Sequence, residues 1–270
     1  MAEGPPRFCI FGDSHYACLK QAEVQGLVDV SGVDLEYWGH VGGRFRYLEF
    51  RDGAIRPVDD FTAMRFAKFN AKGRTTLPAA DFDVILVMGA RVYVWRMFLS
   101  LLRALTEGPF VSRGLQRRLL ADALRGQSGY RLARGLAETG TAQVLLAPIA
   151  YYTGDAVRAA TFFTPAIEAL IPDRVPEFWS VLAETAAEDG IRLLRQPEET
   201  VVQGMFTDEA YAVAGHVAKK DYEHHNAAYG AVILSRVMDM VRTVPRRDPA
   251  DRIAAPDGDG QDEAGRGHDA

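Results

Sequence analysis

Residues 7–15 read RFCIFGDSH, and this stretch determines the fold that we expect. Its first five residues form a short apolar run that ends at Gly12, which is the pattern of a buried β-strand. Ser14 follows where that strand would turn into a helix, expected over residues 16–28. A polar side chain at such a turn lies at the carboxyl edge of a parallel sheet, where open α/β folds bind their ligands.

The rest of the chain repeats this alternation of strand and helix. Residues 82–88, FDVILVM, form the strongest predicted strand because they are apolar, largely β-branched and followed by a glycine. Further strands are expected at 34–38, 142–147 and 191–194, and helical spacing of apolar residues at 94–105, 177–188 and 229–240. We therefore predict a flavodoxin-like α/β fold, a three-layer α/β/α sandwich around a five-stranded parallel sheet. Residues 39–56 carry four glycines and are expected to form a loop.

Composition sets limits on the class of protein. The 270 residues are 48% hydrophobic and 25% charged, with a formal charge of −5, which argues against a nucleic-acid partner. No apolar run is long enough for a membrane span, and the N-terminus lacks the features of a signal peptide. Because two cysteines, Cys9 and Cys18, cannot form a disulfide framework, we expect a cytoplasmic protein. Residues 1–244 are expected to form one domain, and the polar, Asp- and Gly-rich residues 245–270 a disordered tail.

The residues around Ser14 are the first candidate site. At the start of a helix, the backbone N–H of Ser14 would be aimed at a developing oxyanion, while Gly12 lets the chain turn without a Cβ clash. The alternative is structural, since Asp13 or Ser14 could simply cap the helix.

Residues 220–226, KDYEHHN, are the second candidate site. Asp221 precedes His224 by three residues, so its carboxylate could hold the imidazole and fix its tautomer. Asn226 is suited to cap the last helix. The alternative is a polar surface loop next to a helix cap.

Taken together, the two candidates resemble the SGNH/GDSL hydrolase superfamily. FGDSH is similar to the first block of that family, and DYEHHNAAYG to its last, Asp-x-x-His-x-Asn-x-x-x-Gly. The resemblance covers about residues 7–242 and implies the SGNH hydrolase fold, serine acyl-transfer chemistry, and neither metal nor cofactor. It also implies that Ser14 is the nucleophile, His224 the general base and Asp221 its orienting partner.

The middle blocks of the family match less well. The resemblance implies an oxyanion-hole glycine after the second strand, where Gly43 fits best and Gly42 next. After the third strand, Arg91 stands where the family has Asn, and Val92 where it has Asp. A guanidinium is a donor, so Arg91 could stabilise an oxyanion or bind an anionic group of the substrate. The substitution could equally mark a member that has lost hydrolytic power.

The expected function is a serine-dependent ester hydrolase that acts on an acylated carbohydrate or small metabolite. Asp13, His15, Tyr151 and Tyr152 are the candidate substrate-binding residues, although the two tyrosines could equally be core residues. An O-acyltransferase with the same triad and a non-catalytic carbohydrate- or acyl-binding protein remain as alternatives. The long stretch 91–138 is a candidate lid or dimer surface, so a homo-oligomer is an open expectation. Six arginines between Arg113 and Arg134 favour a solvated helical face over an anion-binding cap.

Overall fold

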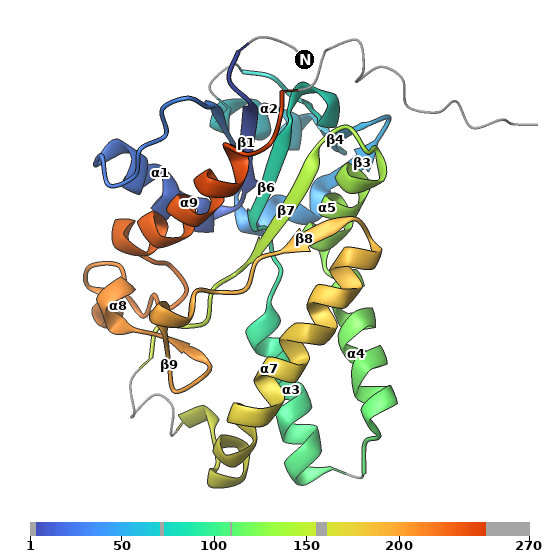
Figure 1. Ribbon diagram of the computed structural model, residues 1–270, viewed down its shortest axis with the longest axis vertical. Helices are drawn as coiled ribbons and strands as arrows, with labels where there is room; N and C mark the ends of the chain where they lie inside the picture. Colours follow the sequence, from blue (N-terminus) through green and yellow to red (C-terminus); the bar gives the residue numbers. More distant parts are fainter. Residues whose placement is uncertain (1–3, 71–72, 109, 155–160, 247–270) are drawn as a thin grey trace, which may run out of the picture.

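A computed structural model describes residues 4–70, 73–108, 110–154 and 161–246 (Figure 1). The tail predicted from residue 245 onward therefore lies, from residue 247, outside the described residues. Within the described part of the chain, no helix has both the length and the apolar character needed to cross a membrane.

A five-stranded parallel sheet forms the centre of the protein (Figure 1). Its strands lie in the order β2-β1-β6-β7-β8, and all neighbouring pairs are parallel. They are β1 (Arg7–Gly12), β2 (Asp34–Gly39), β6 (Val84–Gly89), β7 (Gln143–Pro148) and β8 (Ile191–Leu193). The predicted sheet is confirmed, with strand boundaries that differ from the expected ones by one or two residues.

Helices cover both faces of the sheet. Helices α1 (Ala17–Val24) and α9 (Ala227–Val241) pack against each other on the face that carries Phe8, Ile10 and Leu86. The opposite face, with Cys9, Phe11 and Ile85, is buried in a second and larger core. That core includes side chains of α5 (Ser128–Glu138) and α7 (Pro165–Glu188). Side chains of one strand alternate between the two cores, as a sheet covered on both faces requires, so the three-layer sandwich is confirmed.

The expected loop over residues 39–56 is wrong in part, because it contains a hairpin. Strands β3 (Leu48–Arg51) and β4 (Ala54–Pro57) pair antiparallel, and β5 (Leu77–Pro78) extends them to a small second sheet. The two residues between β3 and β4, Asp52 and Gly53, have φ of 51° and 70°. A two-residue Asp-Gly connection with both φ positive is the preferred turn for a right-twisted hairpin.

The stretch 91–138 forms three helices. Helices α3 (Val94–Glu107) and α4 (Arg113–Arg125) pack on α7 beyond the carboxyl end of β6, while α5 packs on β7 (Figure 1). Most of the arginines in this region lie beside carboxylates: Arg113 pairs with Glu177, Arg117 with Glu184, Arg118 with Asp122, Arg125 with Glu188 and Asp189, and Arg134 with Glu138. The pairs of Arg113, Arg117 and Arg125 join α4 to α7, and the other two pairs lie within α4 and within α5. Together the pairs leave little unbalanced positive charge for an anion-binding cap.

Short elements complete the described chain. Helix α2 (Asp60–Phe69) follows the hairpin, and α8 (His216–Lys219) precedes the last polar loop. Strands β9 (Val201–Val202) and β10 (Phe206–Thr207) form a two-stranded sheet. Short 3-10 helices lie at Ser14–Tyr16, Gly42–Tyr47, Ala79–Asp81, Glu198–Thr200 and Glu209–Tyr211.

Candidate active site

Ser14 lies immediately beyond the carboxyl end of β1, at the first residue of a 3-10 turn. Asp13 caps this turn, since its carboxylate accepts a hydrogen bond from the backbone N–H of His15 at 3.3 Å. The cap therefore uses Asp13 and leaves the Ser14 hydroxyl free for another partner. That partner is His224, whose Nε2 lies 2.8 Å from Ser14 Oγ although the two residues are 210 positions apart.

Asp221 orients the imidazole of His224. One of its carboxylate oxygens, Oδ1, lies 2.8 Å from His224 Nδ1 and also accepts the backbone N–H of His224 at 3.2 Å. Partial burial would raise the pKa of Asp221, but the hydrogen bonds and charge of His224 outweigh it and lower that pKa below its ordinary value. Asp221 is therefore a carboxylate at neutral pH.

The loop that carries His224 is anchored by Asn226. Its side-chain oxygen caps α9 by accepting the N–H of Tyr229 at 3.1 Å. Its amide nitrogen donates to the carbonyls of Ala210 and Ala212, at 2.8 and 3.1 Å. The predicted helix cap thus also fixes the entry of the Asp221–His224 turn relative to the preceding chain.

The turn after β6 adopts an uncommon backbone conformation beside Ser14. Gly89, Ala90 and Arg91 have φ of 70°, 49° and 62°. A Cβ on Gly89 would lie 2.7 Å from Asp13 Oδ1, so this position requires glycine. The backbone N–H of Arg91 donates to Asp13 Oδ2 at 3.3 Å. Left-handed backbone at non-glycine residues costs free energy, and here it places Arg91 next to the loop that carries Asp13 and Ser14.

The guanidinium of Arg91 lies over the ring of Tyr93, 4.8 Å from its centroid. A Cβ built on Gly42 would be 3.4 Å from Arg91 Nη1 and 3.6 Å from Asp13 Oδ2. By contrast, a Cβ on Gly43 would meet no atom within 4 Å. Both glycines lie in the first turn of a 3-10 helix, where backbone N–H groups lack a partner within the helix. Of the two, Gly42 lies beside Arg91 and Asp13.

His15 packs against His224. It is buried, and its ring stacks on that of His224 with centroids 5.0 Å apart and planes at 17°. Burial lowers the pKa of His15, so that imidazole is neutral at pH 7. The structure places His15 behind His224, where it supports the ring, instead of on a surface open to substrate. Asp13 is buried likewise, although it borders the cavity beside Ser14.

The two candidate tyrosines lie in different surroundings. Tyr151 is a core residue, since it is 2% exposed and its hydroxyl accepts a hydrogen bond from Trp179 Nε1 at 2.7 Å. It is therefore not placed to bind substrate. Tyr152 is half-buried, and its hydroxyl accepts a hydrogen bond from Arg96 at 3.0 Å. Of the two, Tyr152 alone lines a cavity next to His224.

Two cavities adjoin the Ser14–His224 pair. One has a volume of about 450 Å³ and opens beside Ser14, between α1, the chain after β2 and the end of α2. The surface that lines it is mostly apolar and includes Val24, Val41 and Phe69. The other, of about 400 Å³, is lined by Tyr152 and residues 219–224. Sequence reasoning missed the first cavity, because Val24 and Phe69 belong to helices far apart in the chain; their exposed apolar side chains become a signal only in three dimensions.

Within the described ranges, no group of three or more His, Cys, Asp or Glu side chains is arranged to hold a metal ion. Cys9 and Cys18 are buried and unpaired. Burial raises the pKa of Cys18 to about 12, so it is an inert thiol in the core.

Comparison with known proteins shows that this chain is similar in structure to two solved proteins. No family model and no curated protein matches the chain. Among solved structures, an extracellular lipase from Streptomyces rimosus is similar with a TM-score of 0.45 and 14% identity, covering 87% of this chain and 99% of the lipase. A protein named as a GDSL-like lipase from Parabacteroides merdae is similar with a TM-score of 0.34 and 10% identity, covering 91% and 99%.

Proposed function

We propose that this protein is a serine-dependent ester hydrolase in which Ser14, His224 and Asp221 form the catalytic triad. One observation carries the proposal. Three residues from opposite ends of the domain form a continuous chain of two 2.8 Å contacts, from hydroxyl to imidazole to carboxylate. Such a chain is the arrangement that activates a serine hydroxyl as a nucleophile.

The proton positions in the triad follow from its partners. Because Asp221 is a carboxylate, Nδ1 of His224 carries the hydrogen of that contact, and Nε2 is left to accept the hydrogen of Ser14. As Ser14 Oγ attacks the ester carbonyl carbon, His224 takes the hydroxyl proton and then delivers it to the departing alcohol. Water, deprotonated by the same imidazole, releases the acid and restores Ser14. Asp221 stabilises the imidazolium formed between these steps.

The tetrahedral oxyanion needs donors on the side of Ser14 away from His224. We assign this role to the backbone N–H groups of Ser14 and Gly42 and to the side chain of Arg91. Gly42 is preferred over Gly43 because it lies beside Arg91 and Asp13. Arg91 brings a permanent positive charge where the related hydrolases have a neutral amide, and donors of this kind contribute several kcal/mol each, about 10²–10³ in rate.

The two cavities suggest how an ester would lie. The mostly apolar cavity beside Ser14 suits an acyl chain, which would contact Val24 and Phe69. The cavity beside His224 carries Lys219, Lys220 and Glu223 together with two tyrosines, so it suits a polar alcohol such as a sugar or small metabolite. We infer a substrate with an aliphatic acyl group on a polar alcohol, and a cytoplasmic location in keeping with two unpaired buried thiols.

A transferase remains a second candidate function. The cavity beside His224 is large enough to hold an acceptor hydroxyl in place of water, and the same triad would then move the acyl group to that acceptor. A purely binding role is less favoured, since His224 is directed at Ser14 and, among the described residues, no carboxylate pairs with Arg91.

The test is covalent labelling by a fluorophosphonate probe. We expect stoichiometric labelling of the native protein and none of Ser14→Ala, with His224→Gln strongly slowed. Ser180→Ala is the matched control, because Ser180 is exposed on α7 and bonded to the carbonyl of Pro176. Native protein that is folded but unlabelled would refute the hydrolase. Hydrolysis of p-nitrophenyl esters with and without added sugar acceptors then separates hydrolase from transferase.

A further inference from the structure

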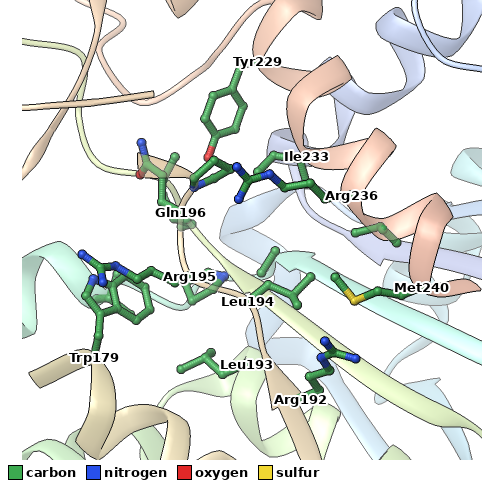
Figure 2. A pocket seen from close by; sticks show the side chains of 17 residues that line it. Trp179, Arg192, Leu193, Leu194, Arg195, Gln196, Tyr229, Ile233, Arg236 and Met240 are labelled. Carbon is green, nitrogen blue, oxygen red and sulfur yellow. The ribbon is translucent and has the colours of Figure 1, made fainter. Parts of the chain in front are cut away.

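A third cavity lies apart from the triad, between β8, helix α9 and the chain that follows β7 (Figure 2). Its volume is about 300 Å³, within the range of small-molecule sites. It shares no lining residue with the cavities beside Ser14 and His224. Part of its wall comes from β8, which is an edge strand of the sheet.

The lining of this cavity is divided between apolar and cationic groups. Leu194 lies at its centre in Figure 2, and α9 contributes Ile233, Val237 and Met240. Three arginines also line it, Arg192, Arg195 and Arg236, whereas none of its lining residues is acidic. An anion in this cavity would therefore meet no acidic lining residue, and the apolar walls would strengthen its attraction to an unpaired guanidinium by reducing solvent screening.

The three arginines differ in their partners. Arg236 holds both carboxylate oxygens of Glu199, at 2.6 and 2.7 Å, and Arg195 lies 3.5 Å from Glu198. Arg192 has no carboxylate within salt-bridge distance among the described residues. Ile191 lies in the core and Leu193 packs against it, so the pleat turns the exposed side chain of Arg192 to the other face of β8, and Arg192 lines the cavity. Arg192 is thus a guanidinium available to a ligand at the mouth of an apolar cavity.

We propose that this cavity is a binding site for an amphiphilic anion, with an aliphatic body on Leu194, Ile233 and Met240 and an acidic head group on Arg192. A guanidinium binds a carboxylate or a phosphate through two parallel hydrogen bonds, and the aliphatic part gains from leaving water. A fatty-acid carboxylate and an alkyl phosphate share this chemistry. The site does not depend on the proposed triad, because no triad residue lines it.

Isothermal titration of the full chain tests the site with four probes of one chain length, below their micellar concentrations. These are decanoate, decyl phosphate, decanol and decylammonium. We expect one of the two anions to bind at least about tenfold more tightly than decanol, and decylammonium not to bind. The stronger anion identifies the head group. Equal affinity for decanol and both anions would overturn the proposal.

Variants locate the binding. Arg192→Gln should weaken anion binding about tenfold. Arg192→Lys should have an intermediate affinity, because lysine keeps the positive charge but cannot form the two parallel hydrogen bonds of a guanidinium. Arg118→Gln is the matched control, since Arg118 is an exposed arginine on α4. Ser14→Ala should bind the anion as tightly as the native protein. Unchanged affinity in Arg192→Gln, or loss in Ser14→Ala, would show that the anion binds elsewhere and refute this site.

Discussion

Arg91 is the residue at which the sequence departs most from the hydrolases it resembles, and its role can be separated by kinetics. Its φ of 62° suits Asn better than Ala, because an Asn side chain tolerates the left-handed region. If Arg91 donates to the oxyanion, Arg91→Ala should lower kcat by about 10²–10³, while Arg91→Asn, which restores an amide donor, should retain more activity. KM should change little in both variants. The measurement is steady-state hydrolysis of a p-nitrophenyl ester.

A different pattern would assign Arg91 to ground-state binding. If Arg91 holds an anionic group of the substrate, its loss raises KM and leaves kcat unchanged. That outcome would contradict the oxyanion role. Thermal unfolding of both variants checks that the strained turn after β6 is intact, since Arg91 also donates its backbone N–H to Asp13.

Among the elements, the β3–β4 hairpin shows how the residue types in a turn determine its backbone conformation. Gly53 has a φ of 70° in the two-residue connection, where a Cβ is disfavoured. Gly53→Ala should therefore lower the free energy of unfolding by roughly 1–2 kcal/mol. Gly114→Ala is the matched control, because Gly114 lies in helix α4 and a Cβ there meets nothing within 4 Å. It should be neutral or slightly stabilising. Urea unfolding measures both, and equal effects would contradict this account of the turn.

The same hairpin shows where sequence reasoning failed for an element. The Asp52–Gly53 pair is a strong hairpin signal, but the surrounding glycines at 39, 42 and 43 favoured a loop for the whole stretch. Strands β1, β6 and β7 at the centre of the main sheet are predictable because each is a short apolar run that ends at a glycine or proline. Helix α7 was longer than expected, since Pro172 and Pro176 lie inside it and normally indicate an end.

For the whole molecule, the order of strands explains why the candidate site could be predicted in part. Ser14 follows β1 and the Asp221–His224 turn enters α9, so both lie at the carboxyl edge. Each local pattern alone is ambiguous, and it is the resemblance of both to the blocks of one family that pairs them. The stacking of His15 on His224 and the core position of Tyr151 depend on contacts between distant elements. No local pattern carries that information, so the sequence alone does not separate a supporting or core role of these two residues from substrate binding.

Several groups of the folded protein, among them two histidines and two aspartates, make its stability depend on pH in the same direction. Burial lowers the pKa of His225 to about 3 and also lowers that of His15. Burial alone would raise the pKa values of Asp189 and Asp221. The hydrogen bonds from Arg125 and Tyr130 and the charge of Arg125 lower the pKa of Asp189, and the hydrogen bonds and charge of His224 lower the pKa of Asp221. An unfolded histidine binds its proton near pH 6.5, so below that pH the unfolded chain holds protons that folded His225 does not. Stability should therefore fall as pH falls from about 6.5, and the two aspartates should add to the loss below their ordinary pKa.

His225→Phe should remove much of this dependence. A ring of similar shape keeps the packing on Tyr229, whose centroid lies 4.6 Å away, but it takes up no proton in the unfolded chain. Between pH 6.5 and pH 4.5, His225 contributes at most about 1.4 kcal/mol per pH unit, so the native protein should lose stability more steeply than the variant. Urea unfolding at pH 7.5, 5.5 and 4.5 gives both slopes. Parallel slopes would mean that folded His225 takes up a proton as readily as it does in the unfolded chain. A histidine lowers the stability at acidic pH only if it stays neutral in the folded core while it is protonated in the unfolded chain.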